Sequence, residues 1–380
     1  MIKSLLAFLV LSLSVSLSAQ KPKEQFLIIG TYTSGSNDGI YVYKFNTETG
    51  ENNFASSVKT SNPSYLAISP NKKFVYAVNE NADSTRFTIT GHVAAFSFDK
   101  TTGKLNFINK QESGGKHPCY VSIDKTGKWV IVGNYSSGSL AVLPVRSNGS
   151  LDSAVNIIQH EGSSVNSERQ EAPHVHATVL NKNNKTLYVP DLGLDEVKLY
   201  NLDTKSGKLK EFDPPFVATE PGAGPRHMDI HPNGKYAYLM EELTGSVSVY
   251  EIEKNGYLTL LQNISGLPRD FDGAIGSADI HVSPDGKFLY CSNRGESNTI
   301  GIFSINKSNG QLEWIDHQST LGKTPRNFNF DPTGNFLLVA NQNSDEIVIF
   351  KRDKETGLLT DSGKRIKVSK PVCLKWMPVE

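Results

Sequence analysis

Short segments of alternating hydrophobic and polar residues recur in pairs along this chain, and a turn rich in Pro, Asn, Asp and Gly joins each pair. Five pairs are clear, at residues 62–80, 117–135, 224–242, 276–294 and 324–342. A looser sixth pair covers residues 172–192, and half a pair covers residues 370–378. Because alternation with a period of two is typical of half-buried strands, each pair predicts a β-hairpin.

The spacing of these hairpins predicts the fold. The marker residues that open them are Pro63, Pro118, Pro173, Pro225, Ser277, Pro325 and Pro371, and the steps between them are 55, 55, 52, 52, 48 and 46 residues. Each hairpin is followed by another alternating segment, a glycine turn and a last strand, so one repeat holds four antiparallel strands. Such a repeat is typical of a propeller blade, and seven markers predict an all-β, seven-bladed β-propeller.

The two ends of the repeat region complete the predicted ring. Residues 370–378 supply a first strand, and residues 26–32 supply a strand that no first strand precedes. We expect the strand around residues 372–376 to pair with the strand around residues 26–30, because this pairing closes one blade and leaves no sheet edge exposed. Residues 20–380 are therefore predicted to form a single propeller domain.

The first 19 residues do not fit the repeat. Lys3 is followed by an apolar, serine-rich stretch and then by small residues that end at Ala19. This order predicts a secretory signal peptide over residues 1–19, with no cysteine to carry a lipid, and hence a periplasmic or secreted protein that is free of the membrane after cleavage. The alternative, a transmembrane anchor, requires a longer uninterrupted apolar run.

Charge and cysteine content narrow the choice of ligand. The 39 basic and 39 acidic residues cancel, so nothing steers the protein toward nucleic acid, and we expect a small neutral or anionic ligand. Cys119, Cys291 and Cys373 fall in predicted strands and are expected to be small buried side chains. The sequence contains no CxxC, HExxH or GxGxxG motif, so we expect no metal and no other cofactor. A closed propeller needs no partner for stability, so we expect a monomer.

Polar residues cluster at the ends of the predicted hairpins. Arg226 and Glu242 are equally far from the turn at Gly234, so they should face each other at the open end of one hairpin, and Arg326 should face Gln342 in the same way. Because the first strand of each blade is innermost, these ends meet at one rim of the central channel. The rim residues are Glu80, Tyr135, His176, Asp191, Arg226, Glu242, Arg294, Arg326 and Gln342.

The predicted rim has the groups needed for proton transfer and anion binding. Counting back from the turn of the looser repeat places His176 in register with Arg226, and His174 points to the same face. Two imidazoles, three guanidiniums and a carboxylate can bind an anion and move a proton. The blander alternatives are a structural Arg226–Glu242 ion pair, a solvated Arg326 and a merely hydrogen-bonded His174.

Other recurrent polar residues are interpreted as structural. Asn79, Asn134, Asn293 and Asn341 stand, with Asp191, at the same place at the end of the second strand of a hairpin. Recurrence in most blades favours a capping role for these residues. The three histidines that alternate differently, His227, His231 and His281, are also interpreted as structural.

The motifs at these positions resemble those of a known family. They are Ala172-Pro-His-Val-His176, Gly222-Ala-Gly-Pro-Arg-His227, Ala237-Tyr-Leu-Met-Glu-Glu242 and Ala278-Asp-Ile-His281, the last followed by Ser283-Pro-Asp-Gly286. The sequence resembles, over essentially the whole predicted mature chain, the seven-bladed lactonase family, which includes propeller-type 6-phosphogluconolactonases and fungal carboxymuconate cyclases. The resemblance implies a catalytic site of His174 or His176, Arg226, Glu242 and Arg294 at the mouth of the channel. Substrate contacts are then expected from the remaining rim residues, Glu80, Tyr135, Asp191, Arg326 and Gln342.

This resemblance predicts hydrolysis of a sugar lactone to the open acid without metal. Glu242 or a nearby histidine would take a proton from water, and Arg226 or Arg294 would stabilise the oxyanion. The predicted signal peptide leaves open whether the lactone is phosphorylated. Two alternatives remain: a carboxymuconate-type cycloisomerase, and a non-catalytic periplasmic propeller that binds carbohydrate or protein. The polar insertion at residues 159–172 could serve in each case as a lid or a contact surface.

Overall fold

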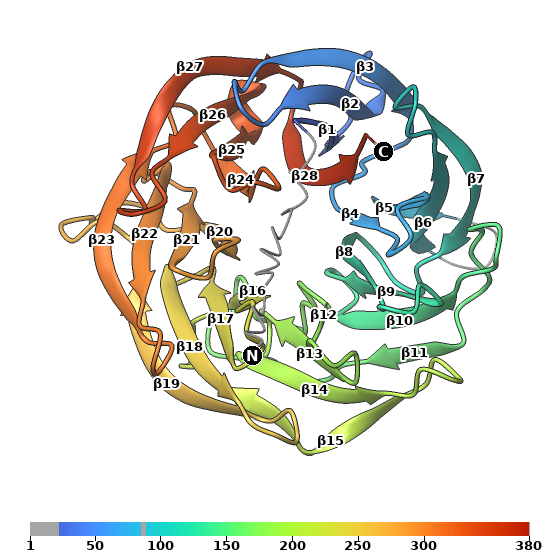
Figure 1. Ribbon diagram of the computed structural model, residues 1–380. Helices are drawn as coiled ribbons and strands as arrows, with labels where there is room; N and C mark the ends of the chain where they lie inside the picture. The colour runs from blue at the N-terminus through green and yellow to red at the C-terminus, as the bar shows by residue number, and fades with distance from the viewer. Residues whose placement is uncertain (1–22, 85–88, 380) are drawn as a thin grey trace, which may run out of the picture.

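The structure, a computed structural model, describes residues 23–84 and 89–379 of the 380-residue chain. In these residues 28 β-strands form seven four-stranded antiparallel sheets arranged around a common axis (Figure 1), which confirms the predicted seven-bladed β-propeller. One 3-10 turn, η1 (Gln342–Ser344), is the only helix of the described part, and none of these residues forms a helix suited to crossing a membrane. The predicted signal peptide, residues 1–19, lies outside the described residues.

The strands of each blade are given below from the axis outward, so the first strand of each list lies nearest the axis (Figure 1). Blade 1 contains β28 (Pro371–Pro378), β1 (Glu24–Thr31), β2 (Gly39–Asn46) and β3 (Asn52–Lys59). Blade 2 contains β4 (Leu66–Ile68), β5 (Phe74–Ser84), β6 (Ile89–Phe98) and β7 (Leu105–Glu112). Blade 3 contains β8 (Pro118–Ile123), β9 (Trp129–Asn134), β10 (Ser139–Pro144) and β11 (Asn156–Gln159).

The remaining four blades repeat this order. Blade 4 contains β12 (Val179–Leu180), β13 (Thr186–Asp191), β14 (Glu196–Leu202) and β15 (Leu209–Ala218). Blade 5 contains β16 (Pro225–Ile230), β17 (Tyr236–Glu241), β18 (Ser246–Ile252) and β19 (Leu258–Ser265). Blade 6 contains β20 (Ser277–Val282), β21 (Phe288–Asn293), β22 (Thr299–Ile305) and β23 (Leu312–Ser319). Blade 7 contains β24 (Pro325–Phe330), β25 (Phe336–Asn341), β26 (Glu346–Arg352) and β27 (Leu359–Lys367).

Blade 1 closes the ring from both ends of the chain. Strands β1 and β28 pair antiparallel, with Phe26 opposite Met377 and Gly30 opposite Cys373, as the sequence predicts. Apolar side chains of this blade, such as Ile29 and Leu374, are fully buried against blade 7. Because β1 pairs with β28 on one side and with β2 on the other, β1 has no free edge.

In five blades, a recurrent polar residue at the end of the second strand binds the segment that follows the outermost strand of the preceding blade. The side-chain amides donate to backbone carbonyls as follows: Asn79 to Ser61, Asn134 to Ser113, Asn293 to Gly266 and Asn341 to Thr320, at 2.5–3.0 Å. In blade 4 the equivalent residue is Asp191, whose carboxylate pairs with His160 at 2.6 Å. These bonds confirm the structural role that the recurrence of these residues predicts.

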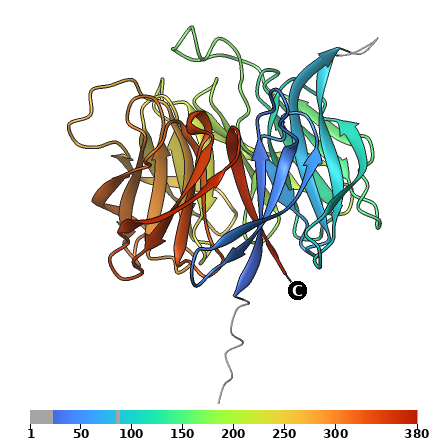
Figure 2. The same ribbon diagram turned by 90° about the horizontal axis from the view of Figure 1, so that it is seen from above.

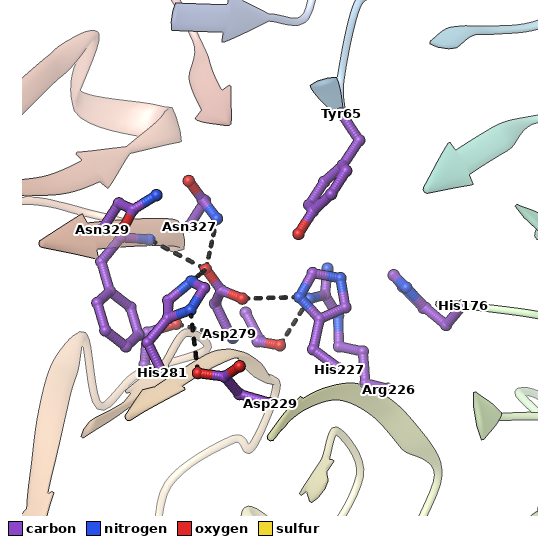
Figure 3. A network of polar contacts seen from close by, with 12 residues as sticks. Tyr65, His176, Arg226, His227, Asp229, Asp279, His281, Asn327 and Asn329 are labelled. Carbon is purple, nitrogen blue, oxygen red and sulfur yellow. Dashed lines mark hydrogen bonds and ion pairs between the residues drawn. The ribbon is translucent and has the colours of Figure 1, made fainter. Parts of the chain in front are cut away.

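β-bulges at the start of the innermost strands decide which side chains reach the axis. The pairing register shifts after Pro118 in β8, after Pro225 in β16, after Ser277 in β20 and after Pro325 in β24. Successive side chains of a regular strand point to opposite faces, whereas an extra residue at a bulge re-aims them. Consecutive residues Arg226 and His227 therefore both reach the innermost strand of blade 6, at the carbonyl of Ala278 and the carboxylate of Asp279 (Figure 3).

The joint between blade 1 and blade 2 gives a first prediction. A Cβ atom placed on Gly30 would lie 2.3 Å from the backbone oxygen of Pro63, so one of the two blades must shift to admit a side chain. We predict that Gly30→Ala lowers the free energy of unfolding by about 1–3 kcal/mol, measured by chemical denaturation followed by circular dichroism. Gly276→Ala is the matched control, because the nearest atom to its Cβ lies 3.7 Å away. Equal losses in the two variants would contradict the prediction.

Candidate active site

A cavity of about 290 Å³ lies at one mouth of the ring and is called the pocket below. Its lining consists of Tyr32, Glu80, Cys119, Tyr135, Arg169, His176, Glu242, Arg294 and Arg326. A larger hollow of about 440 Å³ beside the β1–β2 loop is lined mostly by Ser, Thr, Gly and Asn, and its described lining holds no Glu, His or Arg. The larger hollow contains one acidic and one basic residue, Asp38 and Lys59, whereas two carboxylates, a histidine and three arginines converge in the smaller one. The pocket is therefore the candidate active site.

The Glu242 carboxylate is the centre of the pocket. It directly follows β17, and its Oε2 accepts a hydrogen bond from Arg226 Nε at 2.8 Å and forms an ion pair with Arg294 Nη2 at 3.0 Å. Burial alone would raise the pKa of Glu242, but the charges of Arg294 and Arg226 outweigh burial and hold the pKa well below the usual carboxyl range. Glu242 is therefore charged at neutral pH and is a poor proton acceptor.

The buried guanidiniums are held in place by backbone carbonyls. Arg226 is 1% exposed and donates through Nη1 to the carbonyl of Ala278 at 2.6 Å. Arg294 donates to the carbonyls of Gly276 and Ser277 at 2.8 and 3.1 Å. Burial lowers the pKa of Arg294 to about 10, since the attraction of Glu242 only partly offsets it, and both arginines remain charged at neutral pH.

Arg326 is the cation of the pocket that lacks a carboxylate partner. Its guanidinium lies 5.2 Å from the centre of the Tyr32 ring, and among the described residues it forms no ion pair. The hydroxyl of Tyr32 in turn donates to Glu80 Oε2 at 2.9 Å. Arg326 is therefore placed by a cation–π contact and keeps its hydrogen-bond donors available for a ligand.

His176 lies in the pocket as a neutral imidazole. Its Nε2 atom is 4.0 Å from Glu242 Oε2, and its Nδ1 atom is 3.8 Å from the Cys119 sulfur. Burial, followed by the positive charge of Arg226, holds the pKa of His176 well below its usual value. A neutral imidazole beside a charged carboxylate is suited to accept a proton from a water molecule.

His174 takes a different position. Its ring stacks on Tyr135 at a centroid distance of 4.5 Å, its Nδ1 atom lies 3.1 Å from the carbonyl of Tyr135, and its Nε2 atom lies 3.3 Å from Glu171. The pocket lining includes His176 and Tyr135 but not His174. Of the two candidate histidines, the structure brings His176 to the Glu242–arginine cluster and places His174 behind Tyr135.

The other predicted rim residues divide into two groups. Glu80, Tyr135 and Arg326 line the pocket, as do Glu242 and Arg294, while Arg226 lies behind Glu242. Asp191 is fully buried, and its oxygens bind His160 and the backbone amide of His174. Gln342 begins η1 and donates its backbone amide to Thr324, outside the lining of the pocket.

Three lining residues are absent from the sequence-based site. Tyr32 directly follows the closing strand β1, Cys119 sits at the bulge in β8, and Arg169 lies in the insertion predicted to be a lid or contact surface. Two of them carry a weak sequence signal, because Tyr32 ends the apolar segment 26–32 and Cys119 follows a marker proline. Only the three-dimensional arrangement brings all three into the lining of one pocket.

A second polar layer surrounds the buried carboxylate of Asp279 (Figure 3). His227 Nδ1 and His281 Nε2 lie 2.8 and 3.0 Å from its two oxygens, and Asn327 also donates to it. The rings of His227 and His176 are 5.3 Å apart, so this layer lies directly beside the pocket. The contacts agree with the structural interpretation of His227 and His281. Within the described chain, no group of three or more His, Cys, Asp or Glu side chains is arranged to hold a metal ion.

The comparisons with known sequences cover nearly the whole repeat region. Residues 26–376 match the family model described as "Lactonase, 7-bladed beta-propeller". A 6-phosphogluconolactonase of Formosa agariphila is 42% identical over 339 residues, which are 88% of this chain and 94% of that protein. A 6-phosphogluconolactonase of Bacillus subtilis is 41% identical over 354 residues, which are 92% of this chain and 97% of that protein.

A solved structure supports the same relationship. The periplasmic gluconolactonase of Pseudomonas aeruginosa is 38% identical to this chain and superposes with a TM-score of 0.89, covering 94% of this chain and 100% of the other. The similarity therefore includes every blade that contributes to the pocket.

The Asp279 layer predicts how stability depends on pH. Burial would lower the pKa of His281, but the Asp279 charge outweighs it and raises the pKa to about 9. A raised pKa in the folded state means that the stabilisation is complete below about pH 6.5 and is lost as the pH rises toward 9. We predict that the stability advantage of the unmodified protein over His281→Gln, measured by urea denaturation, shrinks between pH 6.5 and 9.5. The exposed His317→Gln is the control, and a pH-independent difference for His281→Gln would contradict the prediction.

Proposed function

This chain belongs to the seven-bladed β-propeller lactonase family, and we propose that it hydrolyses a sugar lactone to the open aldonic acid, as a carboxylic ester hydrolase that needs no metal. The observation that carries this proposal is the neutral imidazole of His176 facing Glu242 in a pocket walled by guanidiniums. These groups supply a proton acceptor and fixed positive charge, which are the two requirements for attack of water on an ester carbonyl.

His176 is the proton acceptor in this proposal. Water attacks the lactone carbonyl carbon while His176 takes a proton from it, and Glu242 stabilises the imidazolium that forms. Glu242 itself is a poor base, because two buried guanidiniums hold its pKa down. Its roles are to fix Arg226 and Arg294 and to offset the transient positive charge on His176.

The arginines stabilise the oxyanion. As the tetrahedral intermediate forms, negative charge develops on the carbonyl oxygen, and Arg294 and Arg326 are the lining guanidiniums that can bind it. Collapse of the intermediate breaks the bond to the ring oxygen, which leaves with the proton returned from His176. The product is the aldonic acid, which ionises at neutral pH and releases one proton per turnover.

The setting of this reaction is also part of the proposal. The predicted signal peptide over residues 1–19 and the periplasmic gluconolactonase of Pseudomonas aeruginosa both support a periplasmic or secreted enzyme. The balanced charge supports a small-molecule substrate and no nucleic-acid partner, and the closed ring supports a monomer. The carboxymuconate-type cycloisomerase is separated from the lactonase by product analysis, since only the lactonase consumes water.

The proposed function predicts which variant loses activity. We expect the purified protein to accelerate proton release from glucono-δ-lactone or its 6-phosphate, measured with a pH indicator and corrected for the spontaneous rate. His176→Gln should lower kcat by about 10²–10⁴-fold, because it removes the proton acceptor. The exposed His317→Gln is the matched control and should keep full activity. Full activity of His176→Gln would rule out this residue as the base, and no acceleration by the unmodified protein would overturn the lactonase proposal.

The depressed pKa of His176 predicts the pH profile. The active form of the base is the neutral imidazole, so activity is lost only when the pH falls below the lowered pKa. We therefore expect kcat/KM to be constant from pH 7.5 to 5.5, with no decline centred near 6.5, the pKa of an unperturbed histidine. The measurement is a pH series in buffers of constant ionic strength. A half-loss of kcat/KM near pH 6.5 would show that the base is a solvated histidine instead.

A further inference from the structure

Arg169 differs from the other arginines of the pocket in where it comes from. It lies in the loop between β11 and β12, which rises above the face of the ring that carries the pocket (Figure 2). The backbone of this loop is fixed, because the buried Gln170 donates to the carbonyl of Leu192 at 2.9 Å and Ser164 donates to Asp195 at 2.5 Å. The loop therefore holds the Arg169 backbone in place at the entrance, while its side chain reaches Glu242 and Tyr135.

The Arg169 side chain contacts the Glu242 carboxylate from the side of the pocket mouth. Its Nη2 atom donates to Glu242 Oε1 at 2.6 Å and lies 3.4 Å from the hydroxyl of Tyr135. Arg226 and Arg294 bind the other oxygen, Oε2, from the inner side. Glu242 thus has three guanidinium partners, and Arg169 is the one at the mouth.

Of the three arginines that contact Glu242, Arg169 is the most exposed and can most easily exchange Glu242 for a ligand. The side chain of Arg169 is 41% exposed, compared with 1% for Arg226 and 15% for Arg294. A partly exposed ion pair contributes little net free energy, because water competes for both charges. Arg226 and Arg294 are additionally fixed by backbone carbonyls, whereas Arg169 has no further hydrogen bond within the described part of the chain beyond Glu242, Tyr135 and its own loop backbone.

The charge around the pocket favours an anionic ligand. Four guanidiniums, those of Arg169, Arg226, Arg294 and Arg326, face two carboxylates, those of Glu80 and Glu242. His176 is neutral and adds no charge. A neutral lactone ring leaves the surplus positive charge unmatched, whereas a lactone that carries an anionic group elsewhere would balance it.

We propose that Arg169 is a specificity-determining residue that leaves Glu242 on substrate binding and binds a phosphate or carboxylate at the end of the lactone away from the carbonyl. The proposal rests on the proposed lactonase function. Arg169 is at the entrance, while His176 and Arg294 are inside, so an extended substrate that meets both would span the pocket from mouth to floor. The planar guanidinium can bind two oxygens of either anion at once.

Release of Arg169 has a consequence for catalysis. When Arg169 turns to the ligand, Glu242 Oε1 loses its donor and Glu242 keeps two guanidinium partners instead of three. Its negative charge is then less compensated, and it stabilises protonated His176, 4.0 Å away, more strongly. Recognition of the distal anion therefore also strengthens His176 as a base.

The test compares substrates that differ only at the distal end. We expect kcat/KM to be higher for glucono-δ-lactone 6-phosphate, or for a glucaric acid lactone with a distal carboxylate, than for unmodified glucono-δ-lactone. Arg169→Gln should reduce this preference by about ten- to a hundred-fold, the range for a charge-assisted hydrogen bond. The preferred anion distinguishes phosphate from carboxylate recognition. Arg146→Gln, which removes an exposed arginine–aspartate pair outside the pocket, is the matched control.

A binding measurement keeps the inference independent of turnover. Calorimetric titration with gluconate, 6-phosphogluconate and glucarate measures the preference for a distal anion even if no lactone is hydrolysed. A preference that Arg169→Gln abolishes and Arg146→Gln keeps supports the role of Arg169. A preference that Arg169→Gln keeps, or no preference in the unmodified protein, overturns it and leaves the lactonase proposal standing. A missing lactonase activity together with an Arg169-dependent preference overturns the proposed function alone.

Discussion

Seven innermost strands share the narrow space around the axis of the ring, and a regular strand can direct only every second side chain toward that space. The bulges in β8, β16, β20 and β24 relax this limit by placing consecutive residues of one strand in reach of the next blade. Arg226 and His227 show the effect, since the first serves Glu242 and the second serves Asp279. The pocket and the layer beside it both depend on this local change of register.

These two layers each bury one carboxylate, but they balance its charge differently. Asp279 is compensated by His281, whose pKa it raises to about 9, and is further satisfied by the neutral amide of Asn327. Glu242 is surrounded by more cationic groups than it can neutralise. Burying excess charge of one sign is unfavourable for folding, so its presence in the pocket is better explained by a ligand that completes the balance than by stability.

The sequence was sufficient for the fold because the hairpins repeat, and sufficient to place Arg226, Glu242 and His176 near one another because a fixed turn sets their register. It left open which of His174 and His176 acts in the site. It was insufficient wherever a residue lies outside that repeat. Arg169 belongs to an irregular loop, whose course follows from hydrogen bonds such as that of Gln170 to Leu192. The strand register predicts Asp191 at the rim of the channel. In the structure its carboxylate is buried inside the blade, where it pairs with His160. Such competition between partners has no signature in spacing or hydrophobic pattern.

Ring closure by β1 and β28 also determines when the pocket can form during synthesis of the chain. Tyr32, directly after β1, contacts Arg326 in blade 7 and Glu80 in blade 2, so one wall of the pocket is assembled from the beginning and the end of the chain. A growing polypeptide that has emerged only as far as blade 6 has Tyr32 and Glu242 but lacks Arg326 and the strand that pairs with β1. The working pocket is thus the last feature to form during biosynthesis, and a prematurely terminated chain cannot carry the chemistry, however well its earlier blades fold.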